Sequence, residues 1–246
     1  MKRKMLPFTK VPAVFAVVGW LACGCLPAGA AEISGRVTLK GTPPPEIKIV
    51  FDATCGKLHS TNVYTRHYAV GKDDGLADVF VYVKSGLEGK TFPPPKDVPL
   101  IDQVKCVFVP KVIGVRTNQV FRVKNSDPLM HNVHAVPKVE GNDEFNIGQP
   151  LQGMIKEASF AKPEVLVKII CDVHPWMFAY VGVVEHPFFA VTDNDGNFKF
   201  PPGLPAGTYT IEAYHLKAGR MTQQVTVAEE DKKTVNFLLQ VAAPKK

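Results

Sequence analysis

Residues 164–184 read EVLVKIICDVHPWMFAYVGVV, two apolar runs rich in β-branched residues on either side of a short polar centre. Such runs are typical of β-strands. Cys171, His174 and Met177 stand three residues apart, so they cannot share one face of a strand, where side chains alternate. Pro175 also disfavours a helix through this centre. The stretch therefore predicts a β-hairpin whose loop brings a thiol, an imidazole and a thioether together.

These three side chains form a donor set that suits copper. Soft sulfur ligands hold Cu(I), and an imidazole binds copper in both oxidation states. A trigonal copper site needs one more imidazole, and the segment HNVH at residues 131–134 offers it from a neighbouring strand, about 40 residues upstream. His131 and His134 point to opposite faces of a strand, so only one of them can face the metal.

Other interpretations of this pattern explain fewer of its residues. A buried cysteine with incidental neighbours would not account for the ordered spacing together with HNVH. Zinc favours further cysteine, histidine or carboxylate ligands, and Asp172 is the nearby substitute. The motifs C-x-x-C-H of covalent haem and C-x-x-C of dithiol exchange do not occur in the sequence. A Cys–His hydrolase would leave the methionine and the tryptophan of the loop unexplained.

The chain as a whole predicts an all-β protein. Short β-branched or aromatic runs alternate with Gly, Pro and Asn turns, which is typical of a β-sandwich or barrel. Helical periodicity is nearly absent, and a short helix around Ala158 is the one helical candidate. The expected strands are 33–39, 47–51, 78–83, 107–109, 119–123, 165–170, 178–184, 188–191, 197–200, 208–214, 221–227 and 234–239.

Residues 1–30 have the features of a secretory signal peptide. A basic start is followed by the apolar run 11–26 and by the small residues AGA at 28–30, which a signal peptidase recognises. The alternatives are a retained membrane anchor and a lipoprotein modified at Cys23 or Cys25, whose flanking residues fit a lipoprotein signal poorly. We therefore expect a periplasmic or secreted protein with no transmembrane helix in its mature part.

Composition excludes several classes of protein. The chain has 246 residues, of which 46% are hydrophobic and 21% charged, so it is not a disordered chain. Four of the positive charges in the formal net charge of +6 lie in the first 30 residues, which leaves +2 for the remainder. The remaining cations are scattered rather than clustered, so we expect no nucleic-acid partner.

Export would change the meaning of the cysteines. Cys55, Cys106 and Cys171 would remain after removal of the signal peptide, and in an oxidising compartment two of the three should pair. Cys55 and Cys106 have no ligand-like neighbours at short spacing, so we predict a disulfide between them. Cys171 is then the functional thiol.

The segments HNVH and CDVHPWM resemble the cupredoxins, the type 1 blue copper proteins, and in particular their amicyanin-like and plastocyanin-like members. The resemblance implies a Greek-key β-sandwich that binds one copper ion. It also implies that Asn132 braces the thiolate loop and that His134 is not a ligand. Met130 stands where amicyanin-like proteins have proline. The implied copper ligands are His131, Cys171, His174 and Met177.

The resemblance also implies a function. Three strong ligands with a weak axial one leave no open position for substrate, so we expect an electron carrier rather than an enzyme. Its partner would be a redox protein such as a c-type cytochrome or a periplasmic dehydrogenase, docking where His174 reaches the surface among Pro175, Trp176 and Met130. The alternatives are a protein that delivers or sequesters copper and an extracellular structural or adhesion module.

A second resemblance concerns residues 187–241. The segments AVTDNDGNFKF and GLPAGTYTIEAYH are similar to the carboxypeptidase regulatory-like (transthyretin-like) β-sandwich. The opening ISGRVTLKGTPPP resembles the first strand of that family, so strand 33–39 could complete this second sandwich. We expect a copper domain over 32–186, with its core over 76–186, inserted into it or placed before it in tandem.

The remaining histidines carry weaker expectations. We expect His59 and His67 at the surface, and His186 and His215 in structural hydrogen bonds near a domain junction. The alternative is that some of these four histidines form a second metal site.

Overall fold

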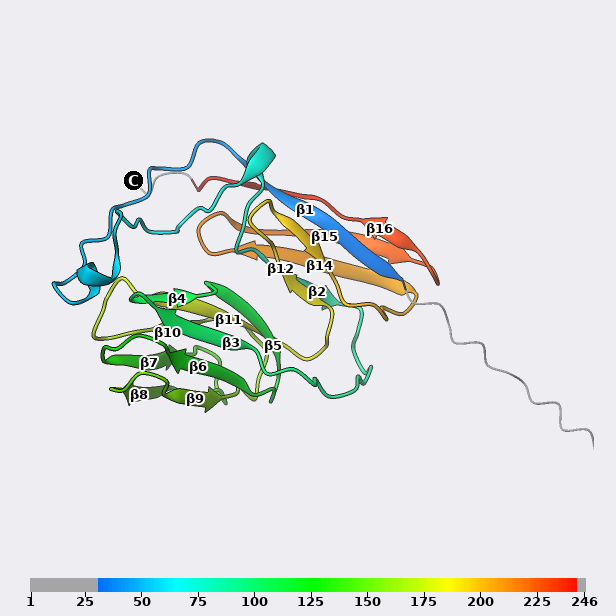
Figure 1. Cartoon of the computed structure of the whole chain (residues 1–246). Coiled ribbons are helices and arrows are strands. Elements are labelled where there is room, and N and C mark those ends of the chain that lie inside the picture. Colours follow the sequence, from blue (N-terminus) through cyan, green and yellow to red (C-terminus); the bar gives the residue numbers. More distant parts are fainter. Residues whose placement is uncertain (1–30, 243–246) are drawn as a thin grey trace, which may run out of the picture.

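The computed structural model describes residues 31–242 (Figure 1). Strands make up 47% and helices 3% of it, and none of its sheets closes, which confirms the prediction of an all-β protein. The predicted signal peptide at residues 1–30, with Cys23 and Cys25, lies outside the described residues. Within residues 31–242, no helix has the length and apolar character needed to cross a membrane.

A central sandwich is formed by consecutive strands of the chain. One sheet has the order β5-β11-β10-β7-β8, and the facing sheet has the order β4-β3-β6-β9. Side chains from both sheets fill one buried cluster that includes Phe121, Phe160 and Ile169. The strands are β3 (Leu100–Val104), β4 (Val107–Val109), β5 (Val112–Arg116), β6 (Phe121–Asn125), β7 (His131–Val136), β8 (Phe145–Gln149), β9 (Ile155–Ala158), β10 (Glu164–Ile170) and β11 (Phe178–Val184).

A terminal sandwich is formed by strands from both ends of the chain. One sheet has the order β13-β1-β16, with β17 also paired to β1, and the other has the order β12-β2-β14-β15. Their buried cluster includes Tyr209, Phe200 and Phe237. The strands are β1 (Glu32–Lys40), β2 (Phe80–Ser85), β12 (Phe189–Val191), β13 (Asn197–Lys199), β14 (Gly207–His215), β15 (Gly219–Val227), β16 (Lys232–Thr234) and β17 (Phe237–Gln240).

Two strands from the N-terminal third of the chain complete the terminal sandwich. Arg36 of β1 pairs with Asn197, and Val37 pairs in parallel with Phe237. Strand β2 lies within the expected metal-domain core over 76–186 and pairs with β12 and β14 of the terminal sandwich. The reason is packing, because alternate side chains of β2 bury themselves in the core shared with β1 and β14. The full division into domains stays a prediction.

The two sandwiches pack face to face through a third apolar cluster (Figure 1). It contains Phe80 and Tyr82 of β2 and Tyr180 of β11. Gly182 of β11 allows the close approach, because a Cβ atom at this position would lie 2.6 Å from the Phe80 ring. The absence of a side chain at Gly182 therefore lets the Phe80 ring pack directly against the backbone of β11.

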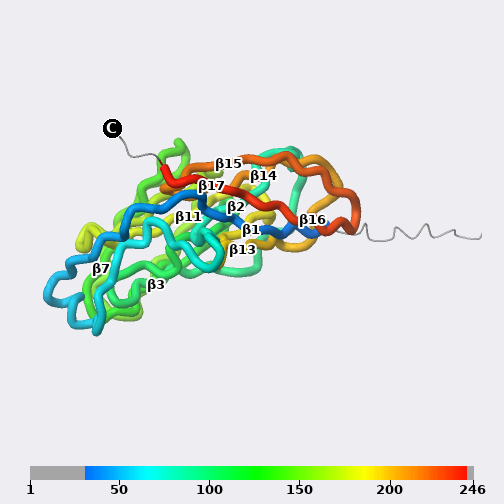
Figure 2. Tube along the Cα trace, turned by 90° about the horizontal axis from the view of Figure 1, so that it is seen from above, coloured from blue at the N-terminus to red at the C-terminus, as the bar shows by residue number. Residues whose placement is uncertain are grey.

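Between β1 and β2 the chain makes a long excursion that lies over one end of the central sandwich. Figure 2 shows this segment, in blue and cyan, running out to β7 and back. It contains the short 3-10 helices η1 (Cys55–Leu58) and η2 (Lys72–Asp74). Asp52 of this excursion lies beside His174, in the loop between β10 and β11.

Three kinds of local prediction failed. The expected strand 47–51 forms only an isolated bridge between Lys48 and Tyr64. The helix expected around Ala158 is wrong, because β9 pairs there with β6 and tertiary pairing outweighs weak local preference. Strands β3, β5 and β8 are further strands that the local pattern missed.

Candidate metal centre

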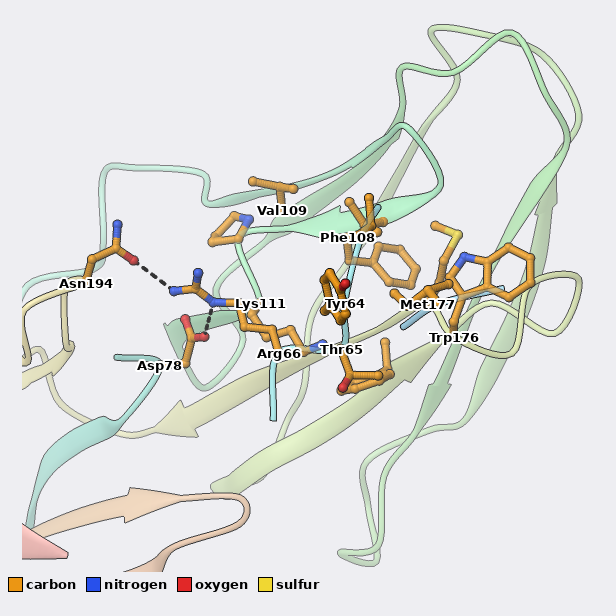
Figure 3. Close-up of a pocket in the computed structure, with 15 residues that line it drawn as sticks. Tyr64, Thr65, Arg66, Asp78, Phe108, Val109, Lys111, Trp176, Met177 and Asn194 are labelled. Carbon is orange, nitrogen blue, oxygen red and sulfur yellow. Dashed lines mark hydrogen bonds and ion pairs between the residues drawn. The ribbon is translucent and has the colours of Figure 1, made fainter. Parts of the chain in front are cut away.

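The loop between β10 and β11 folds back on itself through its own backbone. The Cys171 N–H donates to the Met177 carbonyl at 3.2 Å, and the Met177 N–H donates to the His174 carbonyl at 2.9 Å. The side chains of Cys171, His174 and Met177 are all buried. Trp176 and Met177 also line a cleft on the outer side of the loop (Figure 3). The hairpin predicted from the sequence is thus a closed loop with its donor atoms inside.

Strand β7 brings His131 to this loop. Its Nδ1 lies 2.9 Å from His174 Nδ1 and 4.0 Å from Cys171 Sγ, while His174 Nδ1 lies 3.6 Å from the same sulfur. Met177 is 1% exposed and belongs to the same buried cluster as Cys171. Two imidazole nitrogens and one sulfur therefore face one another in a buried space. This donor set fits a copper ion.

The outer nitrogen of His131 is held by a carboxylate. His131 Nε2 donates to Asp127 Oδ2 at 2.9 Å, and Asp127 also accepts from the backbone N–H groups of Lys105 and Cys106. Burial opposes the charged imidazole, but Asp127 and the Cys171 thiolate outweigh it and raise the pKa of His131 to about 9. Holding Nε2 in this way leaves Nδ1 directed at the sulfur.

Asn132 joins the thiolate loop to strand β7. Its backbone N–H points at Cys171 Sγ at 3.5 Å, and its Oδ1 accepts from the Asp172 N–H at 2.7 Å. Although burial opposes ionisation, hydrogen bonds from His131 and from backbone N–H groups lower the pKa of the Cys171 thiol below its ordinary value. The bracing that the resemblance implied for Asn132 is present in these contacts.

His134 lies on the other face of β7. It contacts Asp172 at 3.1 Å through Nδ1 and Glu144 at 2.8 Å through Nε2, and its side chain is 18% exposed. It therefore sits in a partly exposed ion-pair cluster, away from Cys171 and His174.

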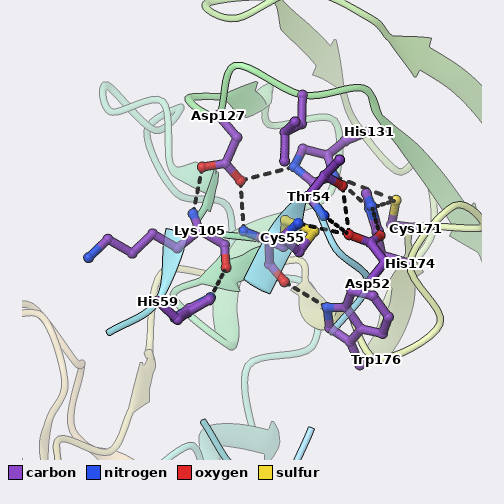
Figure 4. Close-up of a disulfide and its surroundings, with 12 residues drawn as sticks. Asp52, Thr54, Cys55, His59, Lys105, Asp127, His131, Cys171, His174 and Trp176 are labelled. Atoms are coloured by element: carbon purple, nitrogen blue, oxygen red, sulfur yellow. Dashed lines mark hydrogen bonds and ion pairs between the residues drawn. A yellow bond between two sulfur atoms is a disulfide. The ribbon is translucent and has the colours of Figure 1, made fainter. Parts of the chain in front are cut away.

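The excursion between β1 and β2 covers His174. The predicted disulfide between Cys55 and Cys106 is present and ties the excursion to the turn between β3 and β4 (Figure 4). Asp52 lies beside it, with Oδ2 3.4 Å from His174 Nε2 and Oδ1 accepting from the Cys55 N–H at 2.7 Å. We call residues 51–59 the cap. Burial, together with the neighbouring His131, lowers the pKa of His174.

The cap covers the imidazole at the centre of the expected docking surface. Pro175 and Met130 are exposed, but His174 is only 3% exposed and does not reach the surface. Trp176 is half-buried, because its Nε1 donates to the Cys106 carbonyl at 3.0 Å and Phe51 packs edge-on against its ring. The covering residues lie far from the hairpin in sequence, so no local pattern pointed to them.

The remaining histidines form no metal-ligand cluster within residues 31–242. His59 stacks on Phe51 within the cap, and its Nε2 lies 2.7 Å from the Lys105 carbonyl. His67 is half-buried and stacks on Phe178. His186 and His215 bond to backbone atoms near the junction.

Sequence reasoning missed both carboxylates, Asp127 and Asp52. Asp127 precedes His131 by four residues in a turn, which is a usable signal, because a histidine ligand is commonly oriented by a nearby carboxylate. Asp52 precedes Cys55 by three residues and accepts a hydrogen bond from its N–H, but Asp52 lies 122 positions before His174, so its approach to His174 has no local signal.

Comparison with known proteins finds partial likenesses. No family model matches the sequence, and no curated protein matches it. A copper-containing nitrite reductase from Thermus scotoductus SA-01 is similar in structure, with a TM-score of 0.33, 22% identity, and coverage of 42% of this chain and 25% of that enzyme. The match thus spans about a quarter of that enzyme's length.

Two smaller copper proteins are also similar to part of the chain. A purple cupredoxin from Nitrosopumilus maritimus matches with a TM-score of 0.29 and 23% identity, covering 35% of this chain and 98% of that one. A variant of amicyanin in its oxidised form matches with a TM-score of 0.32 and 18% identity, covering 42% and 97%. All three TM-scores lie below 0.5.

Proposed function

We propose that this chain is an exported type 1 copper protein that carries single electrons between redox partners and is not an enzyme. One copper ion would be held by His131 and His174 through Nδ1, by the Cys171 thiolate and by Met177. The observation that carries the proposal is the convergence of two imidazole nitrogens on one buried cysteine sulfur. A copper ion bound there would supply one-electron redox chemistry.

Hydrogen bonds with neighbouring side chains fix the orientation of the proposed ligands. Asp127 holds the His131 ring, and Asn132 holds both the thiolate loop and the strand beside it. Asp52 approaches the outer nitrogen of His174. Preformed hydrogen bonds of this kind fix ligand orientation before metal binds. A donor set with little freedom to rearrange suits repeated gain and loss of an electron.

The cap bears on the choice between a carrier and a copper-delivery protein. Delivery requires the metal to leave, whereas the Cys55–Cys106 disulfide holds residues 51–59 over His174. With both cysteines fully buried, the closed form is well protected. This favours retention of the metal and therefore an electron carrier. A structural or adhesion module would have no use for the converging donor atoms.

The partner and the compartment follow from the same proposal. A disulfide and a signal-like N-terminus suit the periplasm or the outside of the cell. The partner would be a redox protein such as a c-type cytochrome or a periplasmic dehydrogenase, and redox encounters are typically small and weak. Because the cap covers His174, such a partner would approach over the cap rather than at a bare imidazole edge.

The visible and electron paramagnetic resonance spectra of the Cu(II)-loaded protein test this proposal. We expect an intense thiolate-to-copper absorption band, together with one copper ion per chain. Cys171→Ala should abolish the band because it removes the thiolate. Val173→Ala is the matched control, since Val173 lies in the same loop and is 48% exposed. A band retained in Cys171→Ala, or a wild-type protein that binds copper without the band, would overturn the assignment.

A further inference from the structure

A cleft of about 410 Å³ lies beside the hairpin loop (Figure 3). Three parts of the chain form it: residues 63–66 of the excursion, residues 107–111 between β4 and β5, and residues 176–178 of the hairpin. Figure 3 shows Asn194 and Asp78 at one end and Trp176 at the other. The volume lies in the range of pockets that hold small organic molecules.

Four aromatic side chains are among the residues that line the cleft. They are Phe108, Phe178, Trp176 and Tyr64, the last with 51% of its surface exposed. Aromatic faces and edges favour contact with another ring. The exposed tyrosine and the half-buried tryptophan offer two such surfaces to a bound ring. The walls therefore favour a planar, apolar body.

Lys111 supplies a positive charge without a carboxylate partner. Its Nζ lies 3.3 Å from the centre of the Phe178 ring, and none of the ion pairs within residues 31–242 includes it. Burial lowers the pKa of Lys111 to about 8, so the ammonium group is still charged at neutral pH. The Phe178 ring compensates only part of the free-energy cost of removing the Lys111 ammonium group from water.

The other two charges that line the cleft neutralise each other. Arg66 donates to Asp78 at 2.8 Å and to the Asn194 side-chain oxygen at 2.8 Å. Lys111 therefore leaves the lining of the cleft with a net charge of +1. One organic anion would balance this charge and pair with the ammonium group.

We propose that this cleft binds a small aromatic carboxylate, with its ring between Tyr64 and Trp176 and its carboxylate on Lys111. Met177 belongs both to the lining of this cleft and to the proposed copper ligands, whereas Lys111, Tyr64 and Trp176 are not ligands. The recognised features need no metal, so binding is measured on metal-free protein, and its failure would leave the proposed function untouched.

Isothermal titration calorimetry with benzoate tests the proposal on the whole chain. Benzamide is the matched neutral compound, and cyclohexanecarboxylate is the matched non-aromatic anion. We expect benzoate to bind at least tenfold more tightly than either compound, because each lacks one of the two recognised features. This comparison uses the wild-type protein, so it does not depend on the folding of any variant.

Two lysine variants locate the charge. Lys111→Met should weaken benzoate binding at least tenfold. Lys156→Met is the control, because Lys156 also lies over a phenylalanine ring, that of Phe145, but far from the cleft lining. The indole N–H resonance of Trp176, assigned in a Trp20→Phe background, should shift with benzoate. Absence of benzoate binding at millimolar concentration, equal binding of benzamide, or an unchanged affinity in Lys111→Met would overturn the proposal.

Discussion

The central and terminal sandwiches bury very different interiors. Alongside its apolar core, the central sandwich encloses a set of polar side chains, whereas the terminal one encloses three polar residues in the described chain, which are Thr192, Glu212 and His215. The buried polar residues of the central sandwich are Gln103, Gln119, Asn125, Asp127, His131, Asn132, Gln149, Glu164 and His174.

The polar groups of the central sandwich are nearly all paired with one another or with backbone. The Gln103 amide donates to Gln149, and Asn125 Nδ2 donates to the Leu129 and Gln149 carbonyls. Burying such groups costs free energy unless each finds a partner. A fold that needed only stability would use apolar residues there, as the terminal sandwich does. The difference indicates that one sandwich is organised around a site and the other around its core.

His131 of the central sandwich and His215 of the terminal sandwich are buried in opposite ways. His131 gives a ring N–H to a carboxylate, and its pKa rises to about 9. His215 accepts backbone N–H groups of Lys217 and Ala218 through Nδ1, and burial lowers its pKa to about 4. The first environment holds a proton that a metal can displace. The second environment keeps His215 neutral, and its Nδ1 accepts the N–H groups of the turn between β14 and β15.

The strongest test of the comparison is the pair His131→Ala and His134→Ala. We expect His131→Ala to abolish the thiolate-to-copper band, because it removes one of two imidazole ligands. His134→Ala should leave the band and the copper content within experimental error, since its side chain lies in the outer ion-pair cluster. Visible and paramagnetic resonance spectra of both variants give the answer. The reverse pattern would transfer the ligand role to His134.

The next test removes the tie between the cap and the central sandwich. The double variant Cys55→Ser, Cys106→Ser opens a loop whose ends are 51 residues apart in sequence, which should cost about 3–5 kcal/mol of unfolding free energy. Copper removal by a chelator should also become at least tenfold faster than in the wild-type protein. Denaturant unfolding and the decay of the copper band measure the two effects. An unchanged removal rate would show that the cap does not protect the metal.

A third test removes packing from the terminal sandwich alone. Phe237 is 1% exposed and packs beside Phe198, which belongs to the same sheet. Phe237→Ala should lower the unfolding free energy by about 3–5 kcal/mol, because it leaves a cavity. The copper band of the folded protein should keep its position. A shifted band would mean that the two sandwiches share more than their interface.

The smallest effect concerns pH. Because the folded-state pKa of His215 is depressed below its ordinary value, its contribution to stability is full above pH 6.5 and is lost as the pH falls toward 4. His215→Asn keeps an acceptor for the two N–H groups but cannot be protonated. Between pH 7.5 and 4.5 the wild-type protein should lose about 2–3 kcal/mol more than this variant in urea unfolding. Parallel pH profiles would rule out a buried, neutral His215.

Features that depend on neighbouring residues could be predicted from the amino-acid sequence alone. Alternating and β-branched runs indicated most of the strands, and the spacing of Cys171, His174 and Met177 indicated a loop with converging donor atoms. Counting cysteines led to the Cys55–Cys106 disulfide, which is present. These features depend on local geometry, and local geometry is encoded within a few residues.

The residues that cover the site and the strands that complete each sandwich could not be predicted from local sequence. Asp52 meets His174 across 122 positions of sequence, and β1 pairs with β17 at the other end of the chain. Such contacts are selected by the apolar surface that they bury and the polar groups that they pair, summed over the whole fold. The sequence pattern of residues 47–59 does not indicate these distant contacts, so the cap over His174 could be identified only in the folded chain.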